Sequence, residues 1–112
     1  MEYARQIMSA MRGTWLTDSE AELIAVTSSQ TLSELGLTID DDVQAVTVLV
    51  PSGGVVNYNP VAAADATNAV LPSIYTVYRN GVLDTAEFFA ASSTDVSFIV
   101  HKVASDIDGL GA

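Results

Sequence analysis

Cysteine is missing from this 112-residue sequence, and its absence excludes disulfide bonds, thiolate zinc sites and a cysteine nucleophile. Basic side chains are nearly missing as well, because four of them oppose 14 acidic residues and leave a formal net charge of −10. Those four are Arg5, Arg12, Arg79 and Lys102. Nucleic-acid binding draws much of its affinity from lysine and arginine contacts to phosphate, so this charge balance argues against a DNA or RNA partner.

Long apolar runs are also missing from the sequence. No stretch approaches the roughly 18 consecutive apolar residues that a membrane-spanning helix needs, so we expect no membrane partner. The first 15 residues lack the continuous apolar middle of a secretory signal. We therefore expect this segment to remain in the working protein.

The residues that are present suit a single folded domain. Apolar residues make up 49% of the chain and charged residues only 16%, against about 25% in an average domain. A chain of this length is typical of one domain with one core. We expect residues 17–104 to form that domain, residues 1–16 an N-terminal helix or arm, and residues 105–112 a flexible C-terminal tail.

Branched and aromatic residues predict strands through most of the chain, with turn-forming residues between them. The expected strands are Glu22 to Thr27, Val43 to Val50, Val55 to Asn59, Ile74 to Arg79, Ala86 to Ala91 and Val96 to Val103. Gly36 indicates a turn within residues 32–37, and the small residues of 62–69 suit a loop. The pattern predicts a mainly β, single-domain antiparallel β-sandwich or barrel-like fold with a short N-terminal helix or arm.

Residues 46–60, with the sequence VTVLVPSGGVVNYNP, carry no charge and are predicted to form a β-hairpin. The first of its strands is apolar on both faces, because the valines at 46, 48 and 50 alternate with Ala45, Thr47 and Leu49. One core covers only one face of such a strand, so an extra element or another molecule must cover the second. Self-association is the simplest explanation. In the last strand we expect Val96, Phe98 and Val100 to face the core.

The N-terminal segment has the spacing of a short helix, with Tyr3, Ile7 and Met11 on one stripe and Gly13 as its end. A helix of this length is marginal alone and must pack on something. It either docks on its own domain or contacts a neighbouring subunit. In the second case the expected partner-binding residues are Tyr3, Arg5, Ile7, Met8, Met11, Arg12 and Trp15, with the arginines pairing with acidic groups of the partner.

We find no pattern that predicts catalysis, a cofactor or a metal. His101 is the only histidine, and Ser97 and Asp95 are merely its neighbours in sequence, so we interpret it as a partly exposed histidine of a sheet. The run Asp40-Asp41-Asp42 lacks the spaced ligands of a calcium loop and is typical of a solvated turn. We therefore expect a protein that is not an enzyme.

Four aromatic residues are candidates for stacking on sugar rings: Trp15, Tyr58, Tyr75 and Tyr78. Tyr75 and Tyr78 lie three positions apart, so on one strand they point to opposite faces and cannot form one platform. Packing in a core or an interface is the favoured use. A carbohydrate-binding or adhesion module stays open as an alternative function.

About 60 residues at the C-terminal end resemble small accessory proteins of tailed bacteriophage virions. The matching segments include an alanine- and threonine-rich loop ending in Leu-Pro, the stretch LDTAEFFAASS and a final valine-rich strand. They are Val55 to Asn59, Ala62 to Pro72, Tyr75 to Tyr78 and Leu83 to Val103. The resemblance implies a capsid decoration (cement) protein, a β-sandwich that binds the major capsid protein on the virion surface as a homotrimer. A head-to-tail connector component is the related alternative.

Overall fold

The computed structural model describes residues 16–79 and 82–103. These ranges contain eight β-strands, joined by turns and loops, and no helix. The strands form two antiparallel sheets, which confirms the mainly β, single-domain fold. They are β1 (Leu16–Asp18), β2 (Glu22–Val26), β3 (Gln30–Thr31), β4 (Val43–Leu49), β5 (Asn57–Asn59), β6 (Ile74–Tyr78), β7 (Glu87–Phe89) and β8 (Thr94–Val103).

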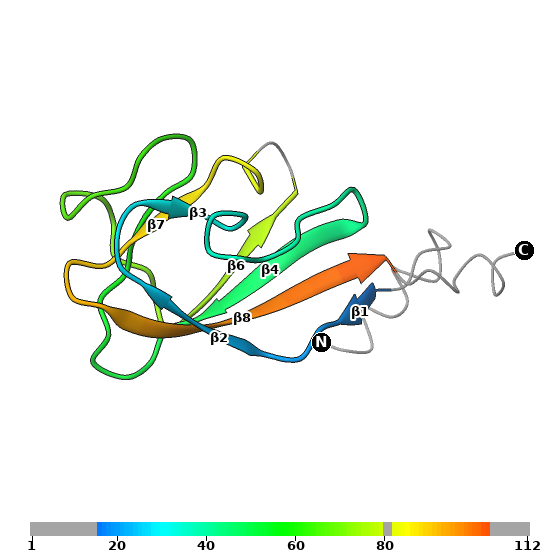
Figure 1. Cartoon of the computed structure of the whole chain (residues 1–112), viewed down its shortest axis with the longest axis horizontal. Helices are drawn as coiled ribbons and strands as arrows, with labels where there is room; N and C mark the ends of the chain where they lie inside the picture. Colours follow the sequence, from blue (N-terminus) through cyan, green and yellow to red (C-terminus); the bar gives the residue numbers. More distant parts are fainter. Residues whose placement is uncertain (1–15, 80–81, 104–112) are drawn as a thin grey trace, which may run out of the picture.

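The larger sheet is built around β8, its longest strand, with β4 on one side and both β1 and β2 on the other (Figure 1). β1 pairs with the end of β8, from His101 to Val103, and β2 pairs with its beginning, from Thr94 to Phe98. Between them Ser19 keeps the edge bonded, because its N–H donates to Val100 O (2.8 Å) and its hydroxyl accepts from Val100 N–H (2.9 Å). β6 lies beyond β4 and ends the sheet.

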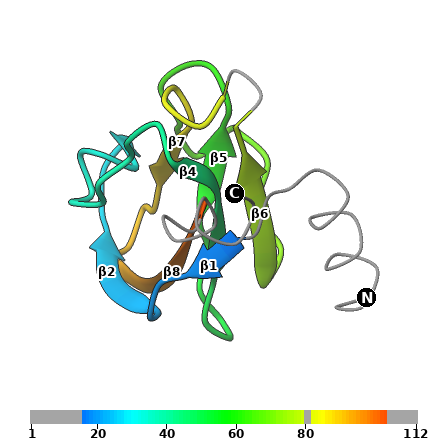
Figure 2. The same cartoon turned by 90° about the vertical axis from the view of Figure 1, so that its right-hand side faces the viewer.

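The smaller sheet has the order β3-β7-β5 and lies against the larger one (Figure 2). Aromatic rings join the two sheets. Phe98 of β8 meets Phe88 of β7 edge-on, at 6.1 Å between centroids, and Phe88 lies 5.3 Å from Tyr58 of β5. Tyr58 in turn lies 5.2 Å from Tyr75 of β6, back in the larger sheet. This row of rings fixes the spacing of the two layers, since such pairs add to the energy of plain burial.

The alternation of β8, and of β4 from Val46 onward, sorts the side chains as the sequence predicted. Val96, Phe98 and Val100 are buried in the core, and so are the valines at 46, 48 and 50. The intervening residues of β8, namely Ser97, Ile99, His101 and Val103, are half-buried. The predicted turn at Gly36 is also confirmed, with a φ of 105° that glycine tolerates best.

The predicted β-hairpin over residues 46–60 is wrong. A turn is present, because Gly54 N–H donates to Pro51 O at 2.9 Å and Gly53 has a φ of 81°. However, β4 pairs with β6 and β8, whereas β5 pairs with β7 in the other sheet. Turn residues show where the chain reverses direction, but tertiary packing decides which strand becomes the partner.

Two strands were not predicted, β1 and β3, which are only three and two residues long. Residues 62–69 form the predicted loop. The predicted N-terminal helix or arm and the predicted C-terminal tail lie outside the described residues. Within the described ranges, no helix has the length and apolar character needed to cross a membrane.

Candidate functional site

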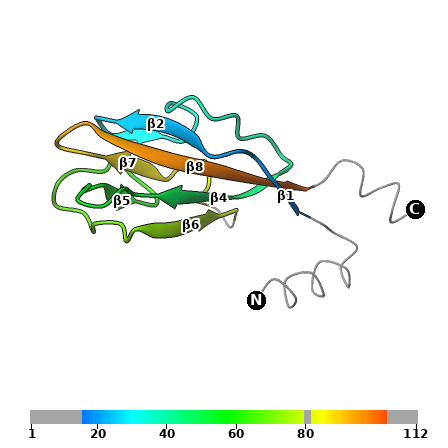
Figure 3. The same ribbon diagram turned by 90° about the horizontal axis from the view of Figure 1, so that it is seen from below.

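The face of the larger sheet that points away from the smaller sheet is the candidate site, and we call it the outer face. The pairing registers place its side chains in rows across β2, β8, β4 and β6, the strand order seen in Figure 3. Its members are Asp18, Leu23, Ala25, Ala45, Thr47, Leu49, Ile74, Thr76, Tyr78, Asp95, Ser97, Ile99, His101 and Val103. Two of these are acidic, Asp18 on β1 and Asp95 at the start of β8, and the rows between them are apolar or neutral.

Large apolar side chains are exposed at both margins of the outer face. Leu23 of β2 is 66% exposed, and Ile74 and Tyr78 of β6 are 65% and 61% exposed. Leu49 and Ile99, in the strands between, are half-buried. A chain of strong net negative charge therefore presents a broad sheet face with little charge of its own, a composition typical of surfaces that contact other proteins.

A row of polar contacts crosses the same face on four strands. Asp18 Oδ1 lies 2.6 Å from His101 Nδ1, and His101 Nε2 lies 2.7 Å from Thr47 Oγ1. Thr47 Oγ1 continues to Thr76 Oγ1 at 3.1 Å. Because these side chains belong to β1, β8, β4 and β6, the row ties the short β1 and the edge strand β6 to the centre of the sheet.

The order carboxylate, imidazole, hydroxyl is that of a nucleophilic triad, so its chemistry needs weighing. A triad also needs free N–H groups near the nucleophile to stabilise an oxyanion. Thr47 lies in β4, which pairs with β8 on one side and β6 on the other, so the amides around Thr47 are bonded within the sheet. The arrangement can polarise the Thr47 hydroxyl, but β4 supplies no oxyanion donor beside it. We interpret the row as a structural device.

The structure gives His101 different partners from those nearest in sequence. Asp18 and Thr47 contact the imidazole, whereas Ser97 and Asp95 only share its face of β8. The histidine side chain is 16% exposed, which agrees with a partly exposed histidine of a sheet.

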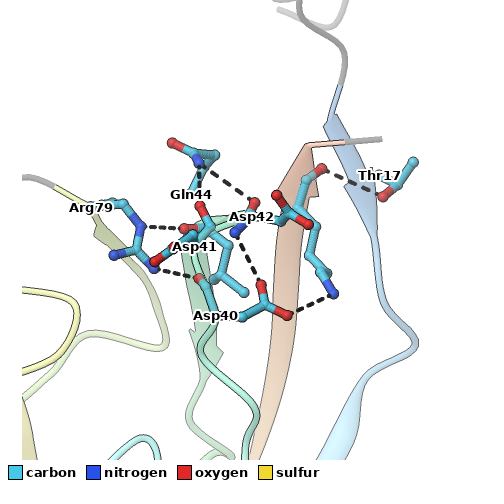
Figure 4. A network of polar contacts seen from close by, with 8 residues as sticks. Thr17, Asp40, Asp41, Asp42, Gln44 and Arg79 are labelled. Atoms are coloured by element: carbon cyan, nitrogen blue, oxygen red, sulfur yellow. Dashed lines mark hydrogen bonds and ion pairs between the residues drawn. The ribbon is translucent and has the colours of Figure 1, made fainter. Parts of the chain in front are cut away.

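The acidic run Asp40 to Asp42 forms a bonded turn at the end of the larger sheet (Figure 4). Asp40 accepts a hydrogen bond from Asp42 N–H at 3.0 Å, and this bond, supported by Lys102 Nζ at 3.4 Å, holds the pKa of Asp40 below its usual value. Arg79 donates to the carbonyl oxygens of Val43 and Asp40. The described part of the chain contains no group of three or more acidic or histidine side chains arranged to hold a metal ion.

The tyrosines do not form an exposed platform for a sugar ring. Tyr58 and Tyr75 pack on each other between the sheets, and burial, aided by Tyr75, raises the pKa of Tyr58 to about 12. Tyr78 points to the outer face, which confirms that Tyr75 and Tyr78 lie on opposite sides of β6. Trp15 lies outside the described residues.

The partner-binding residues predicted from the sequence, Tyr3, Arg5, Ile7, Met8, Met11, Arg12 and Trp15, all lie outside the described residues. Sequence reasoning missed Leu23 and Ile74 as surface candidates, and it weighed Tyr78 only for sugar stacking or for packing in a core or an interface. A signal for Ile74 and Tyr78 was available, since no acidic residue occurs from Ala66 to Leu83 in a chain that has 14 of them. Comparison with protein families, curated proteins and solved structures finds no match to this chain.

Proposed function

We propose that this protein is a structural virion protein, a capsid decoration protein that binds the major capsid protein on the head surface and associates with its own copies. The observation that carries the proposal is the outer face, with exposed Leu23, Ile74 and Tyr78 and little charge between its ends. A decoration protein holds neighbouring subunits together by buried contact area, and stable interfaces of this kind are more apolar than ordinary surfaces. The resemblance of about 60 C-terminal residues to accessory proteins of bacteriophage virions is the reason for proposing a capsid as the surface that is bound.

The two-sided apolar strand that suggested self-association lies in the middle of the sheet. β4 is covered by the core on one face, while Thr47 and Leu49 are half-buried on the other. Contact with a second molecule therefore involves the outer face around β4 or an edge of the sheet, and not the backbone of β4 itself. The N-terminal arm is the second proposed contact, reaching across boundaries between capsid subunits through Arg5 and Arg12.

Co-sedimentation with heads assembled from the major capsid protein of the same source tests the proposal. The Leu23→Asp variant should bind the heads less tightly, because it places a charge on the outer face. Val61→Asp is the matched control, since Val61 is 70% exposed but lies in a loop away from this face. Equal binding by the two variants would show that the outer face does not attach the protein.

Deletion of residues 2–12 tests the arm separately. We expect it to abolish attachment to heads while circular dichroism still reports a folded β domain. Electron microscopy of decorated heads gives the location. Extra density over the whole shell is the expected result, whereas density restricted to the tail vertex would refute decoration and indicate a head-to-tail component.

A further inference from the structure

The last strand of the larger sheet, β6, has one partner among the described residues, β4. Val50 N–H donates to Ser73 O, and Arg79 N–H donates to Gln44 O, both at 2.9 Å. Backbone groups alternate in direction along a strand, so the odd-numbered residues of β6 bond to β4. The N–H and C=O groups of Ile74, Thr76 and Tyr78 therefore point away from β4, along the edge of the sheet.

This edge lacks the features that usually keep a strand single. Such features are a charged side chain, a proline or a bulge within the strand. Residues 74–78, with the sequence IYTVY, contain none of them. Arg79 follows directly, but its guanidinium turns back to donate to Val43 O and Asp40 O.

The opposite edge of the sheet is protected by charged side chains and by a break between two short strands. There the chain runs as two short strands, β1 and β2, with an interruption from Ser19 to Ala21. Its side chains include Asp18, Glu20 and Glu22, so the edge is acidic as well as broken. Of the two edges of the larger sheet, the β1–β2 edge is therefore protected against pairing with a further strand, and the β6 edge is open to it.

The distribution of charge makes β6 the edge at which a second copy of this chain is least repelled. Two copies of a chain with a net charge of −10 repel each other over most of their surfaces. From Ala66 to Leu83 there is no acidic side chain, and β6 lies inside this stretch. A second copy can therefore approach β6 against β6 with less repulsion than at the acidic edge.

We infer that β6 pairs with β6 of a second copy, antiparallel and about a twofold axis at Thr76, so that two larger sheets join into one. In this register Thr76 faces its own counterpart, and Ile74 faces Tyr78 of the other copy at both ends. Each of the three residues with outward backbone groups then exchanges hydrogen bonds with its opposite number. The exposed isoleucine and tyrosine form cross-strand pairs of the favoured aromatic and β-branched type.

This inference deepens the proposed function, on whose self-association it rests, and it names a twofold contact where the resemblance implies a threefold one. A five-residue edge buries less area than the roughly 1,200 Å² of a standard stable interface. Pairing should therefore depend on concentration in solution and be reinforced when copies are held side by side on a shell.

Light scattering of the full chain over a concentration series measures the pairing. We expect the mass to rise from 11.8 kDa to twice that value. The Ile74→Glu/Tyr78→Glu variant should weaken association at least about tenfold, because it sets like charges opposite each other at both ends. The Ile74→Lys/Tyr78→Glu variant should associate again, since each lysine then faces a glutamate of the other copy. Both positions are exposed, so the fold should tolerate either pair of changes.

Amide hydrogen exchange separates edge pairing from other contacts. The N–H groups of Tyr75 and Val77 point toward β4 and should be protected at every concentration. Those of Ile74, Thr76 and Tyr78 should gain protection as concentration rises, in step with the mass. An oligomer without protection at these three amides would overturn edge pairing and leave self-association through the outer face intact.

Other outcomes also overturn the inference. A mass of three chains would favour the trimer. Protection that is independent of concentration and lost on deleting residues 2–12 would show that the chain's own N-terminal segment occupies the edge. A single-chain mass at all concentrations would remove self-association, whereas attachment to heads is judged by co-sedimentation and can succeed or fail independently.

Discussion

Replacing Tyr58 by phenylalanine should make the protein less sensitive to alkaline pH. Tyr58 lies between the sheets, 5.2 Å from Tyr75 and 5.3 Å from Phe88, measured between ring centroids. Burial raises its pKa from the ordinary value of 10.0 to about 12, because the phenolate is poorly solvated there. The neutral phenol is thus favoured by the fold, and the contribution of Tyr58 to stability is complete below pH 10 and is lost as pH rises toward 12.

The size of the effect follows from linkage. A shift of two pKa units corresponds to about 2.7 kcal/mol, and screening at a half-buried ring reduces this to about 1–2 kcal/mol. At neutral pH, Tyr58→Phe should change the free energy of unfolding by less than about 1 kcal/mol, since the ring contacts remain. Between pH 10 and 12 the wild type should lose about 1–2 kcal/mol relative to the variant.

Urea unfolding followed by circular dichroism at a series of pH values measures this difference. Groups common to both proteins titrate in both, so their effects cancel in the comparison. Tyr78→Phe is the matched control at protein concentrations too low for β6 to pair, because Tyr78 is 61% exposed in the single chain. If the difference between wild type and Tyr58→Phe stays constant up to pH 12, the proposed burial of Tyr58 between the sheets is wrong.

Three further changes test other parts of the structure. Thr47→Val removes the hydroxyl that lies 2.7 Å from His101 Nε2, so the free energy of unfolding measured in urea should fall by about 1 kcal/mol. An unchanged free energy would show that the polar row does not stabilise the sheet. Gly53→Ala should cost about 1 kcal/mol in thermal unfolding, because residue 53 has a φ of 81° and open space around it, whereas Gly53→Asn should cost less. Equal costs would contradict the backbone explanation. The Asp42 amide keeps the pKa of Asp40 low, so wild type has a contribution to stability above pH 3.8 that it loses as pH falls below that value. In a plot of the free energy of unfolding against pH, Asp40→Asn should therefore flatten the acid limb, the fall in stability below pH 3.8. An unchanged limb would exclude Asp40 as its source.

The fold class and the faces of the strands could be predicted because they depend on local alternation. Val96, Phe98 and Val100 recur every second residue, and any sheet that buries one of them buries all three. Strand pairing could not be predicted in the same way. The chain turns at Gly53 as expected, but β4 finds its partners in β6 and β8 because the core favours those contacts over the strand that follows it.

The polar row on the outer face was beyond sequence reasoning for a related reason. His101 bonds to Asp18, 83 residues away, and to Thr47, 54 residues away. Nothing in the spacing of these residues marks them as neighbours, and β1, which carries Asp18, is too short to give a periodic signal. The stretch without acidic residues that contains β6, by contrast, is visible in the sequence. Only the structure shows that this stretch forms an edge of the sheet.

The pairing of Leu16 with Val103 has a mechanical consequence. The described chain enters β1 and leaves β8 at the same end of the sheet, so a load applied between these two points would pull the strands apart one hydrogen bond at a time. A load between Leu16 and the turn at Gly53 would instead drag strands lengthwise and strain many bonds together. Tethered at its N-terminal end, the domain would resist a pull from its far end better than a pull on its own C-terminus.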